Sequence, residues 1–500
     1  MNDWEELLAE LERKRDFARS MGGAERLDRQ RSSGKLDARQ RLECLFDDGT
    51  FVEIGSLAGN LSEHTKAPAP ADGLIAGFGQ VEGRVVLAAA EDFTVLAGSI
   101  GDAGSAKRFR LIDLALQERA PLVFMLEGAG HRLTNEHGAP APGDLQALAQ
   151  LSGLVPTVAL VMGPSAGHSA LTAALSDFVV MTESSSLFTA GPPIVKGALG
   201  EVATKEQLGG ADVQTRSGVA HNIAEDDRAA IAMARRYLSY FPSNAGEAPP
   251  RETAGADQRR RLDGILDLIR VDPRFPFDAR VLLDMVADAG SLLEIQPNFG
   301  ASLVTSLARM GGMPVAILAN NPAVAAGSVD SAAAQKAAHF MEGADAFHLP
   351  VIFLTDNPGV LPGTASERAG VLRHAARMFA VQNRLRVPKL HVTLRKAFGF
   401  GSSIMAMNPF DRQTLSLAFP SVTIGAMPAS SGAQAAGMDT AEQAKEVSRQ
   451  SRSAWTMGHK MAYDDIIDPR ELRNVLLDGL MLAQARWKGP LAPRPQGVLP

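Results

Sequence analysis

Two halves of this chain repeat one another, and the repeat limits the possible folds more than any other feature of the sequence. Between residues 83 and 130, shifting the chain by 229 positions gives 13 identities in 48 positions without a gap, several times what chance would give. The matched positions include Ala97–Ser99 with Ala326–Ser328, Pro121 with Pro350 and, where an insertion changes the offset to 232, Gly167 with Gly399. The simplest interpretation is two copies of one domain.

The sequence pattern of each copy is that of strands connected by helices. Apolar runs that follow Gly or Pro predict buried strands, and segments with apolar residues at helical spacing predict helices between them. In the first copy the predicted strands are 83–92, 121–130 and the run from 155, with helices at 109–119 and after 167. In the second copy they are the run from 317, 350–359 and the run from 387, with a helix at 332–345. The pattern predicts an α/β fold.

The length of 500 residues exceeds the size at which one hydrophobic core stops growing, about 250–300 residues. A charged N-terminal segment with leucines at helical spacing, residues 1–45, predicts a helical arm. A segment rich in Pro, Gly and charge within 243–262 predicts a linker. We therefore expect a first domain at 46–242 and a second at 263–500.

Composition excludes several classes of protein. A net charge of −6 gives no general attraction to nucleic acid, and no apolar run reaches the roughly 18 residues of a membrane-spanning helix. The N-terminus has no apolar signal core, and the single cysteine, Cys44, excludes an intrachain disulfide. We expect a cytoplasmic protein that is not bound to membranes.

Both copies place a glycine-rich turn where a strand hands over to a helix. Glycine lets a ligand approach unpaired backbone N–H groups closely, which favours an anion or oxyanion site. The four turns are 127–132, 163–169, 356–364 and 396–403, and none matches a P-loop or a dinucleotide-binding fingerprint. Ordinary strand-to-helix packing is the alternative for each turn, but four turns at symmetric places favour chemistry by backbone dipoles on a carbonyl oxygen.

No arrangement of side chains in the sequence competes with these turns. His131, His137 and His168 cluster in the first copy, but no carboxylate stands beside them at helical ligand spacing, so lining histidines are favoured over a metal site. Ser165 lacks the spacing of a nucleophile elbow. The sequence predicts no metal in this chain.

Long collinear strings resemble the carboxyltransferase (β) subunits of biotin-dependent acyl-CoA carboxylases, of the propionyl-CoA and methylcrotonyl-CoA carboxylase type. The similarity spans residues 30–480. Its strings include GKLDARQRLECLFDDGTFVEIG (34–55), AGPPIVKGALGEVATKEQLGGADV (190–213), LTDNPGVLPGTASERAGVLRHAARM (354–378) and MAYDDIIDPRELR (461–473). The resemblance implies a tandem duplication of a crotonase-like β-β-α superhelix domain, which agrees with the repeat.

The resemblance also implies a mechanism. Carboxybiotin on a separate carrier protein gives up its carboxyl group at an interface of two chains, and an acyl-CoA enolate captures it. Two oxyanion sites would hold the enolate and the biotin ureido oxygen: Gly167 and His168 for the first, Phe400 and Gly401 for the second. Substrate-binding positions would be Gly128, Ala129, Gly130, Ser165, Ala166, Gly191 and Ser403. Positions for the biotin cofactor would be Gly359, Gly363, Thr364 and Gly399.

The sequence departs from the family at both oxyanion sites. The family pattern AGGA is here Ala166–Ser169, with His168 at a glycine position, and FGGAYD is here Phe398–Ser403, with Phe400 at a glycine position. A backbone N–H survives any substitution except proline, so the oxyanion role can persist in a reshaped pocket. Ser403 stands where propionyl-type members commonly have Asp, which suggests another acyl chain.

The resemblance implies partners as well. Only GHKMA around Lys460 comes near a biotinylation sequence, with no carrier module around it, so we interpret Lys460 as a surface lysine and expect a separate biotin carboxylase and carrier subunit. The family implies a homohexamer, a trimer of dimers. The alternatives are the carboxyltransferase of an acyl-CoA decarboxylase, a biotin-independent crotonase-like enzyme, and a catalytically impaired scaffold subunit.

Overall fold

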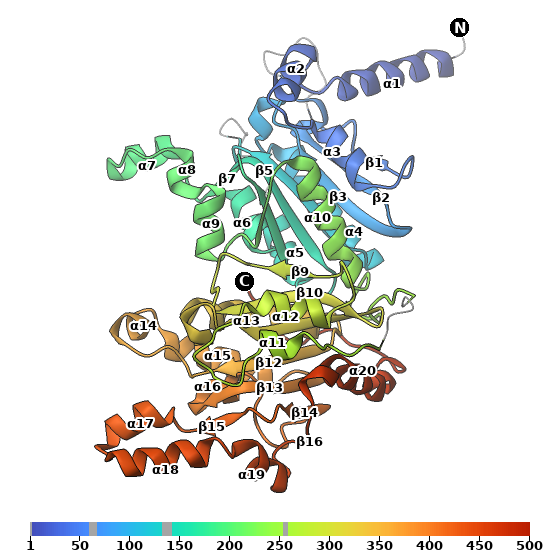
Figure 1. The fold of residues 1–500 in the computed structure, drawn as a ribbon. Helices are drawn as coiled ribbons and strands as arrows, with labels where there is room; N and C mark the ends of the chain where they lie inside the picture. The colour runs from blue at the N-terminus through green and yellow to red at the C-terminus, as the bar shows by residue number, and fades with distance from the viewer. Residues whose placement is uncertain (1–2, 60–67, 133–142, 254–258) are drawn as a thin grey trace. The chain divides into compact units, whose positions relative to one another are not determined.

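The computed structural model describes residues 3–59, 68–132, 143–253 and 259–500 (Figure 1). The chain divides into two compact units, Met1–Ser239 and Tyr240–Leu499. The division falls just before the segment predicted as a linker.

The first unit is built on one eight-stranded sheet. Its strands are β1 (Val52–Ile54), β2 (Leu74–Val81), β3 (Arg84–Glu91), β4 (Leu122–Gly128), β5 (Thr157–Ala166), β6 (Phe178–Thr182), β7 (Ser186–Phe188) and β8 (Asn222–Ala224). The order is β1-β2-β3-β4-β5-β6-β8, with β7 paired to β5. Strands β1 to β3 pair antiparallel, and the pairs from β3 onward are parallel.

The second unit repeats this sheet strand for strand. Its strands are β9 (Leu293–Ile295), β10 (Leu303–Met310), β11 (Met313–Asn320), β12 (Val351–Asn357), β13 (Lys389–Phe398), β14 (Leu415–Ala418), β15 (Thr423–Gly425) and β16 (Asp465–Ile466). The order β9-β10-β11-β12-β13-β14-β16, with β15 on β13, is that of the first unit. The duplication inferred from the sequence is therefore a duplication of topology.

Small irregularities are repeated too. The register between the two long parallel strands shifts between Leu126 and Gly128 in the first unit and between Thr355 and Asn357 in the second, at positions related by the 229-residue offset. Ala97 and Ala326, also matched by that offset, both have a φ of 54°. Such a backbone is unfavourable for alanine, so its presence in both copies indicates inheritance of one detailed structure.

Helices cover the faces of both sheets, as expected for parallel strands buried on two sides. The first unit has α1 (Asp3–Arg19), α2 (Ala24–Ser32), α3 (Ala38–Leu45), α4 (Asp102–Glu118), α5 (Asp144–Leu151), α6 (His168–Ala174), α7 (Pro192–Leu199), α8 (Lys205–Gly209), α9 (Ala211–Ser217) and α10 (Asp227–Tyr240, whose last residue is counted with the second unit). The second has α11 (Ile265–Leu268), α12 (Ala279–Val286), α13 (Ser331–Ala346), α14 (Thr364–Arg368), α15 (Val371–Asn383), α16 (Gly399–Ile404), α17 (Ala429–Ala436), α18 (Thr440–Gln450), α19 (Ser453–His459) and α20 (Leu472–Leu482).

The three N-terminal helices differ in how deeply they are buried. Helix α1 buries only Ala18 and is otherwise largely exposed, as an arm would be. Helix α3 is different, because Arg41, Leu42 and Leu45 are fully buried. The segment predicted as an arm thus ends in a helix that packs into the first unit. In the described part of the chain, no helix has the length and hydropathy of a membrane span.

Candidate active site

Two glycine turns adjoin at the end of the first sheet. One follows β4 at Gly128 and continues through Gly130, which has a φ of 81°; the other follows β5 at Gly167, which has a φ of 57°. A Cβ on Gly130 would lie 3.0 Å from the carbonyl oxygen of Ala166 and 4.0 Å from the amide nitrogen of His168. Glycine is needed at 130 because the second turn occupies that space.

The amides of these turns are not equally available. Gly167 donates its N–H to the carbonyl of Phe188 on β7 at 3.2 Å, and Ala129 donates to Ala97 at 3.1 Å. The amide of His168, the first residue of α6, has no acceptor among the described residues. This amide is therefore available to polarise a ligand oxygen.

The other predicted substrate positions in the first unit line the same region or support it. Ser165 is fully buried, and its hydroxyl points back to the carbonyl of Gly163 at 3.4 Å. Gly128 is packed so closely that a Cβ would lie 2.4 Å from the carbonyl oxygen of Gly98. Gly191 precedes α7 and lies against the ring of Phe188.

The side chain of His168 belongs to a row of hydrogen-bonded polar groups that the sequence did not predict. Its Nε2 is 2.7 Å from Oδ2 of Asp144, and its Nδ1 is 3.0 Å from Nε2 of His131. Asp144 also accepts a hydrogen bond from Nε of Arg108 at 2.9 Å. Burial opposes the charge of Asp144, but the hydrogen bond from His168 and the charge of Arg108 lower its pKa to about 2. The carboxylate is therefore ionised at neutral pH.

Arg108, at one end of this row of hydrogen-bonded groups, is itself held in place by several contacts. Its guanidinium donates to Glu91 at 3.1 Å and to Thr172 at 2.6 Å, and it lies 4.8 Å from the ring centre of Phe124. Glu91 also accepts from the hydroxyl of Ser169 at 2.7 Å. Burial raises the pKa of Glu91, and Arg108 opposes that rise. A charged network therefore supports the turn that carries His168.

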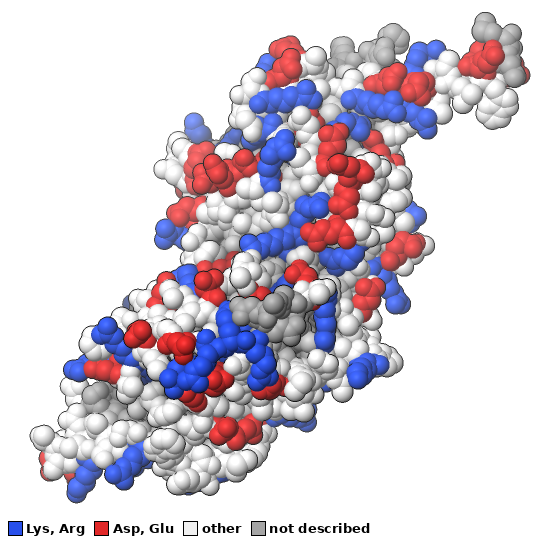
Figure 2. All heavy atoms as spheres, turned by 45° about the vertical axis from the view of Figure 1, so that its right-hand side comes forward, with Lys and Arg blue, Asp and Glu red and all other residues white. Residues whose placement is uncertain are grey.

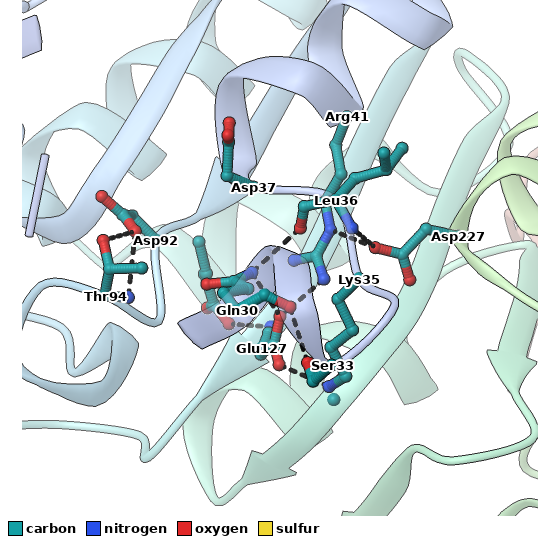
Figure 3. Close-up of polar contacts among 12 residues, drawn as sticks. Gln30, Ser33, Lys35, Leu36, Asp37, Arg41, Asp92, Thr94, Glu127 and Asp227 are labelled. Atoms are coloured by element: carbon teal, nitrogen blue, oxygen red, sulfur yellow. Dashed lines mark hydrogen bonds and ion pairs between the residues drawn. The ribbon is translucent and has the colours of Figure 1, made fainter. Parts of the chain in front are cut away.

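The carboxylate that ends β4, Glu127, is paired by residues from the N-terminal helices (Figure 3). Lys35 Nζ and Arg41 each approach it at 2.6 Å, and Arg41 also reaches Asp227 at 2.8 Å. All but Lys35 are buried. These pairs fix the N-terminal segment to the strand end that carries the glycine turn.

A cavity of about 420 Å³ opens beside Glu127 and the β5 turn. Its lining is strongly basic: Arg26, Arg29, Lys35 and Lys205 stand with Gln30, Ser33, Phe93, Thr94, Glu127 and Pro164. On the face shown in Figure 2, basic and acidic side chains are intermixed. The cavity is of a size and charge that suit an anionic small molecule.

The second unit builds the equivalent pair of turns. Gly399, with a φ of 57°, opens α16, and Gly359 has a φ of 134° after β12. A Cβ on Gly401 would lie 2.7 Å from Cα of Gly359, so the two turns are in direct contact. Asn357 bridges them by donating to the carbonyl of Gly401 at 2.7 Å and accepting from Gly359 at 2.8 Å. Phe400 is 51% exposed beside them.

The remaining predicted positions of the second unit lie on, or at the start of, two helices, α16 and α14. Ser403 stands one turn along α16, where its carbonyl accepts from Asn408 at 3.0 Å. Gly363 and Thr364 begin α14 and are exposed. In the described residues, no group of three or more His, Cys, Asp or Glu side chains is arranged to hold a metal ion. The predicted position His137 lies outside the described residues.

Sequence reasoning thus found the turns but not the groups around His168. Asp144 is 24 residues before His168 and Arg108 is 36 residues before Asp144, so no local spacing signals either contact. The N-terminal cations on Glu127 were missed for the same reason. Only the topology of the sheet brings these side chains together.

Adjoining glycine turns at the ends of neighbouring parallel strands, repeated in tandem, are the kind of structure from which backbone amides can stabilise a negatively charged oxygen. The chain matches the carboxyl transferase domain family over residues 29–485. It is 33% identical to the propionyl-CoA carboxylase carboxyltransferase subunit of Haloferax mediterranei over 97% of both chains. It is 34% identical to the methylmalonyl-CoA decarboxylase subunit alpha of Veillonella parvula over 96% of both chains.

Among solved structures, transcarboxylase 12S matches over 100% of both chains with a TM-score of 0.91 and 32% identity. That protein was crystallised as a hexamer with methylmalonyl-coenzyme A and methylmalonic acid bound. The protein belongs to the carboxyl transferase domain family and has the duplicated fold of its members. It is an enzyme of the acyl-CoA carboxyltransferase kind. The resemblance inferred from the sequence is confirmed.

Proposed function

We propose that this chain is the carboxyltransferase subunit of a biotin-dependent acyl-CoA carboxylase, with carboxybiotin arriving on a separate carrier subunit. The observation that carries the proposal is the pair of adjoining glycine turns at the same place in both units of a chain that matches transcarboxylase 12S throughout. Two such turns supply one oxyanion site for each of two substrates. The sequence identity to propionyl-CoA carboxylase subunits supports the same reaction class.

In the first unit, the acyl-CoA site is proposed to use the amide of His168. A thioester carbonyl placed against this N–H gains stabilisation as negative charge moves onto its oxygen during enolate formation. Gly130 shapes the approach because a Cβ there would lie 3.0 Å from the carbonyl oxygen of Ala166, so glycine lets the two turns come together. Removal of one such donor typically costs about 3–4 kcal/mol of transition-state stabilisation.

The basic cavity beside Glu127 is proposed to receive the phosphates of coenzyme A. Lys205 and Arg26 stand on its wall, so a thioester bound at His168 has cationic side chains within the same unit. Phosphate groups are strong acceptors that arginine and lysine recognise well.

In the second unit, the turn at Gly399–Gly401 is proposed to face the biotin ureido oxygen, with Gly359, Gly363 and Thr364 alongside. When bound, carboxybiotin supplies the carboxyl group and, once this has left, a basic nitrogen. Phe400 is half exposed at this turn, so its ring is available to pack against an apolar face of a ligand. Its backbone N–H is retained, unlike that of a proline.

Direction of the reaction is a second question, since the decarboxylase relatives are as similar as the carboxylase relatives. The methylmalonyl-CoA decarboxylase subunits alpha of Veillonella parvula and Propionigenium modestum share 34% and 32% of residues with this chain. A decarboxylase would use the same two turns in reverse, passing the carboxyl group from substrate to biotin. Carboxylation remains the function that we propose.

The proposal includes partners and assembly. A biotin carboxylase with a carrier domain would load the carboxyl group, and the chain would act as a hexamer, as transcarboxylase 12S does. We place the enzyme in the cytoplasm.

The test reconstitutes the chain with a biotinylated carboxylase and carrier subunit from the same organism, ATP, bicarbonate and a panel of acyl-CoAs. The proposal predicts ATP-dependent incorporation of labelled bicarbonate into one acyl-CoA. Incorporation should fall when avidin blocks the biotin. A zero rate across the panel, with the partner fully biotinylated and acyl-CoA bound, contradicts carboxylation and leaves the reverse reaction to be measured from the corresponding malonyl-type thioester.

A further inference from the structure

The two glycine turns of the first unit carry two histidines whose side chains the proposed biotin chemistry does not use. His131 follows the β4 turn and is exposed, whereas His168 follows the β5 turn and is largely buried, with a side chain 10% exposed. Their rings meet edge to face with centres 4.6 Å apart. They stand beside the turn amide that we assign to the thioester oxygen, that of His168.

With both rings neutral, the hydrogen bonds assign a tautomer to each ring. Asp144 is ionised and can only accept, so Nε2 of His168 must carry the proton it shares with that carboxylate. In neutral His168, Nδ1 is then an acceptor, and the nitrogen that donates to it is Nε2 of His131. The remaining nitrogen of His131, Nδ1, therefore carries a lone pair.

That lone pair is available to a ligand. No described residue is hydrogen-bonded to Nδ1 of His131, and the side chain is exposed at the mouth of the turn. Burial lowers the pKa of His131 from its ordinary value, which favours the neutral ring. A proton taken up at Nδ1 places positive charge on a ring linked through His168 to Asp144, as the imidazolium of a catalytic triad is linked to its aspartate.

The second unit shows that the fold does not require this arrangement. Glu91 and its counterpart Asn320 perform the same structural task, since each accepts the backbone N–H at the end of the next strand, at 2.8 Å and 3.2 Å. The positions that match Arg108, His131 and His168 are Ala337, Val360 and Phe400. The buried strand ends are thus stabilised in both units, while the histidine pair is present in one.

We propose that His131 is an acid–base catalyst at the acyl-CoA site, with His168 and Asp144 as positioning residues, so that this chain exchanges the α-proton of an acyl-CoA without biotin. The inference rests on the proposed function, because it places the thioester at the amide of His168. Nδ1 of His131 accepts the α-proton as the C–H bond breaks, and the electron pair moves to the thioester oxygen as an enolate. Return of a solvent-derived proton from the same nitrogen restores the thioester, so no oxidant or reductant is consumed.

The test is deuterium exchange by the full-length oligomer purified without its biotinylated partner. The chain is incubated in D₂O with acetyl-, propionyl- or 3-methylcrotonyl-CoA, and deuterium at the α-carbon (the γ-carbon for 3-methylcrotonyl-CoA) is followed by mass spectrometry while calorimetry measures binding of each thioester. We expect exchange for a thioester that binds, and a decrease of about 100-fold or more in His131→Gln. The matched control is His459→Gln, an exposed histidine in the second unit, which should exchange like the unsubstituted chain.

The roles of His168 and Asp144 as positioning residues are tested by whether added imidazole restores exchange, a result that a purely structural role would not predict. In His131→Ala, exchange should be restored in part by added imidazole, whereas His168→Gln and Asp144→Asn should lose exchange without such rescue. Thioester binding with no exchange in the unsubstituted chain overturns this inference and leaves the carboxyltransferase proposal standing. Failure of every thioester to bind overturns the carboxyltransferase proposal itself. Unchanged exchange in His131→Gln, with binding retained, excludes His131 as the base.

Discussion

Gly401 lies directly against the backbone of Gly359, so closely that a Cβ on Gly401 would stand 2.7 Å from both Cα and the carbonyl carbon of Gly359. The contact locks together the two turns that form the proposed biotin site. It also explains why position 401 tolerates no side chain although position 400 carries a phenylalanine, which is half exposed.

Gly401→Ala should separate these turns. Because the clash is with backbone rather than with a movable side chain, we expect a loss of about 1–3 kcal/mol in the free energy of unfolding, measured with urea, together with loss of carboxyl transfer. Gly343→Ala on α13 is the control, since a Cβ at position 343 would meet no neighbouring atom within 4 Å, and it should be neutral or slightly stabilising. Equal stability of the two variants would show that the turns can shift apart at no cost.

Arg41→Met should destabilise the first unit. The substitution leaves the buried carboxylates of Glu127 and Asp227 without their shared guanidinium, for which a loss of about 3–5 kcal/mol is typical. Arg29→Met, which removes an exposed pair with Glu25, should change stability by less than about 1 kcal/mol. Urea denaturation of both variants measures the difference, and a similar small effect for both would mean that α3 is not anchored by this network.

The stability of the unsubstituted chain should depend on Asp144 at acid pH. Its pKa is about 2 in the folded chain and near 3.9 when unfolded, so its contribution is present above about pH 4 and is lost as the pH falls towards 2. Asp144→Asn should show a shallower loss across that window, by about 1–2 kcal/mol. Urea titrations between pH 5 and about pH 2.5 measure the slopes, and parallel slopes would refute the assignment.

Lys205→Met should weaken binding of coenzyme A thioesters. If the basic cavity holds phosphate, the variant should raise KM for the acyl-CoA about 10-fold, with little change for the corresponding acyl-pantetheine, which lacks those phosphates. Lys460→Met is the control, because Lys460 is exposed beyond α19 in the second unit. An equal rise in KM for both thioesters would place the phosphates elsewhere.

Much of the architecture could be predicted from the sequence, because strands and helices follow from the local pattern of apolar residues and the two domains follow from the repeat. The strands ending at Gly128 and Ala166 and their partners in the second copy were expected from apolar runs closed by glycine, and the structure has them. A repeat whose offset changes only once, from 229 to 232, also predicts equivalent topology, and the structure shows that even the register shifts recur.

The polar groups of the site could not be predicted in the same way. The contact of His168 with Asp144 depends on how α5 packs beside α6, and the contact of Glu127 with Arg41 depends on α3, a distance of 86 residues along the chain. Such contacts leave no periodicity in the sequence. They are set by tertiary packing alone.

The central claim is that the backbone amide of His168 polarises the thioester, and a proline comparison tests it most directly. His168→Ala keeps this N–H, whereas His168→Pro removes it at the first position of a helix, where proline is well tolerated. Carboxyl transfer by His168→Pro should be about 100- to 1,000-fold slower than by His168→Ala, with thioester binding retained. Equal rates for the two variants would contradict the account.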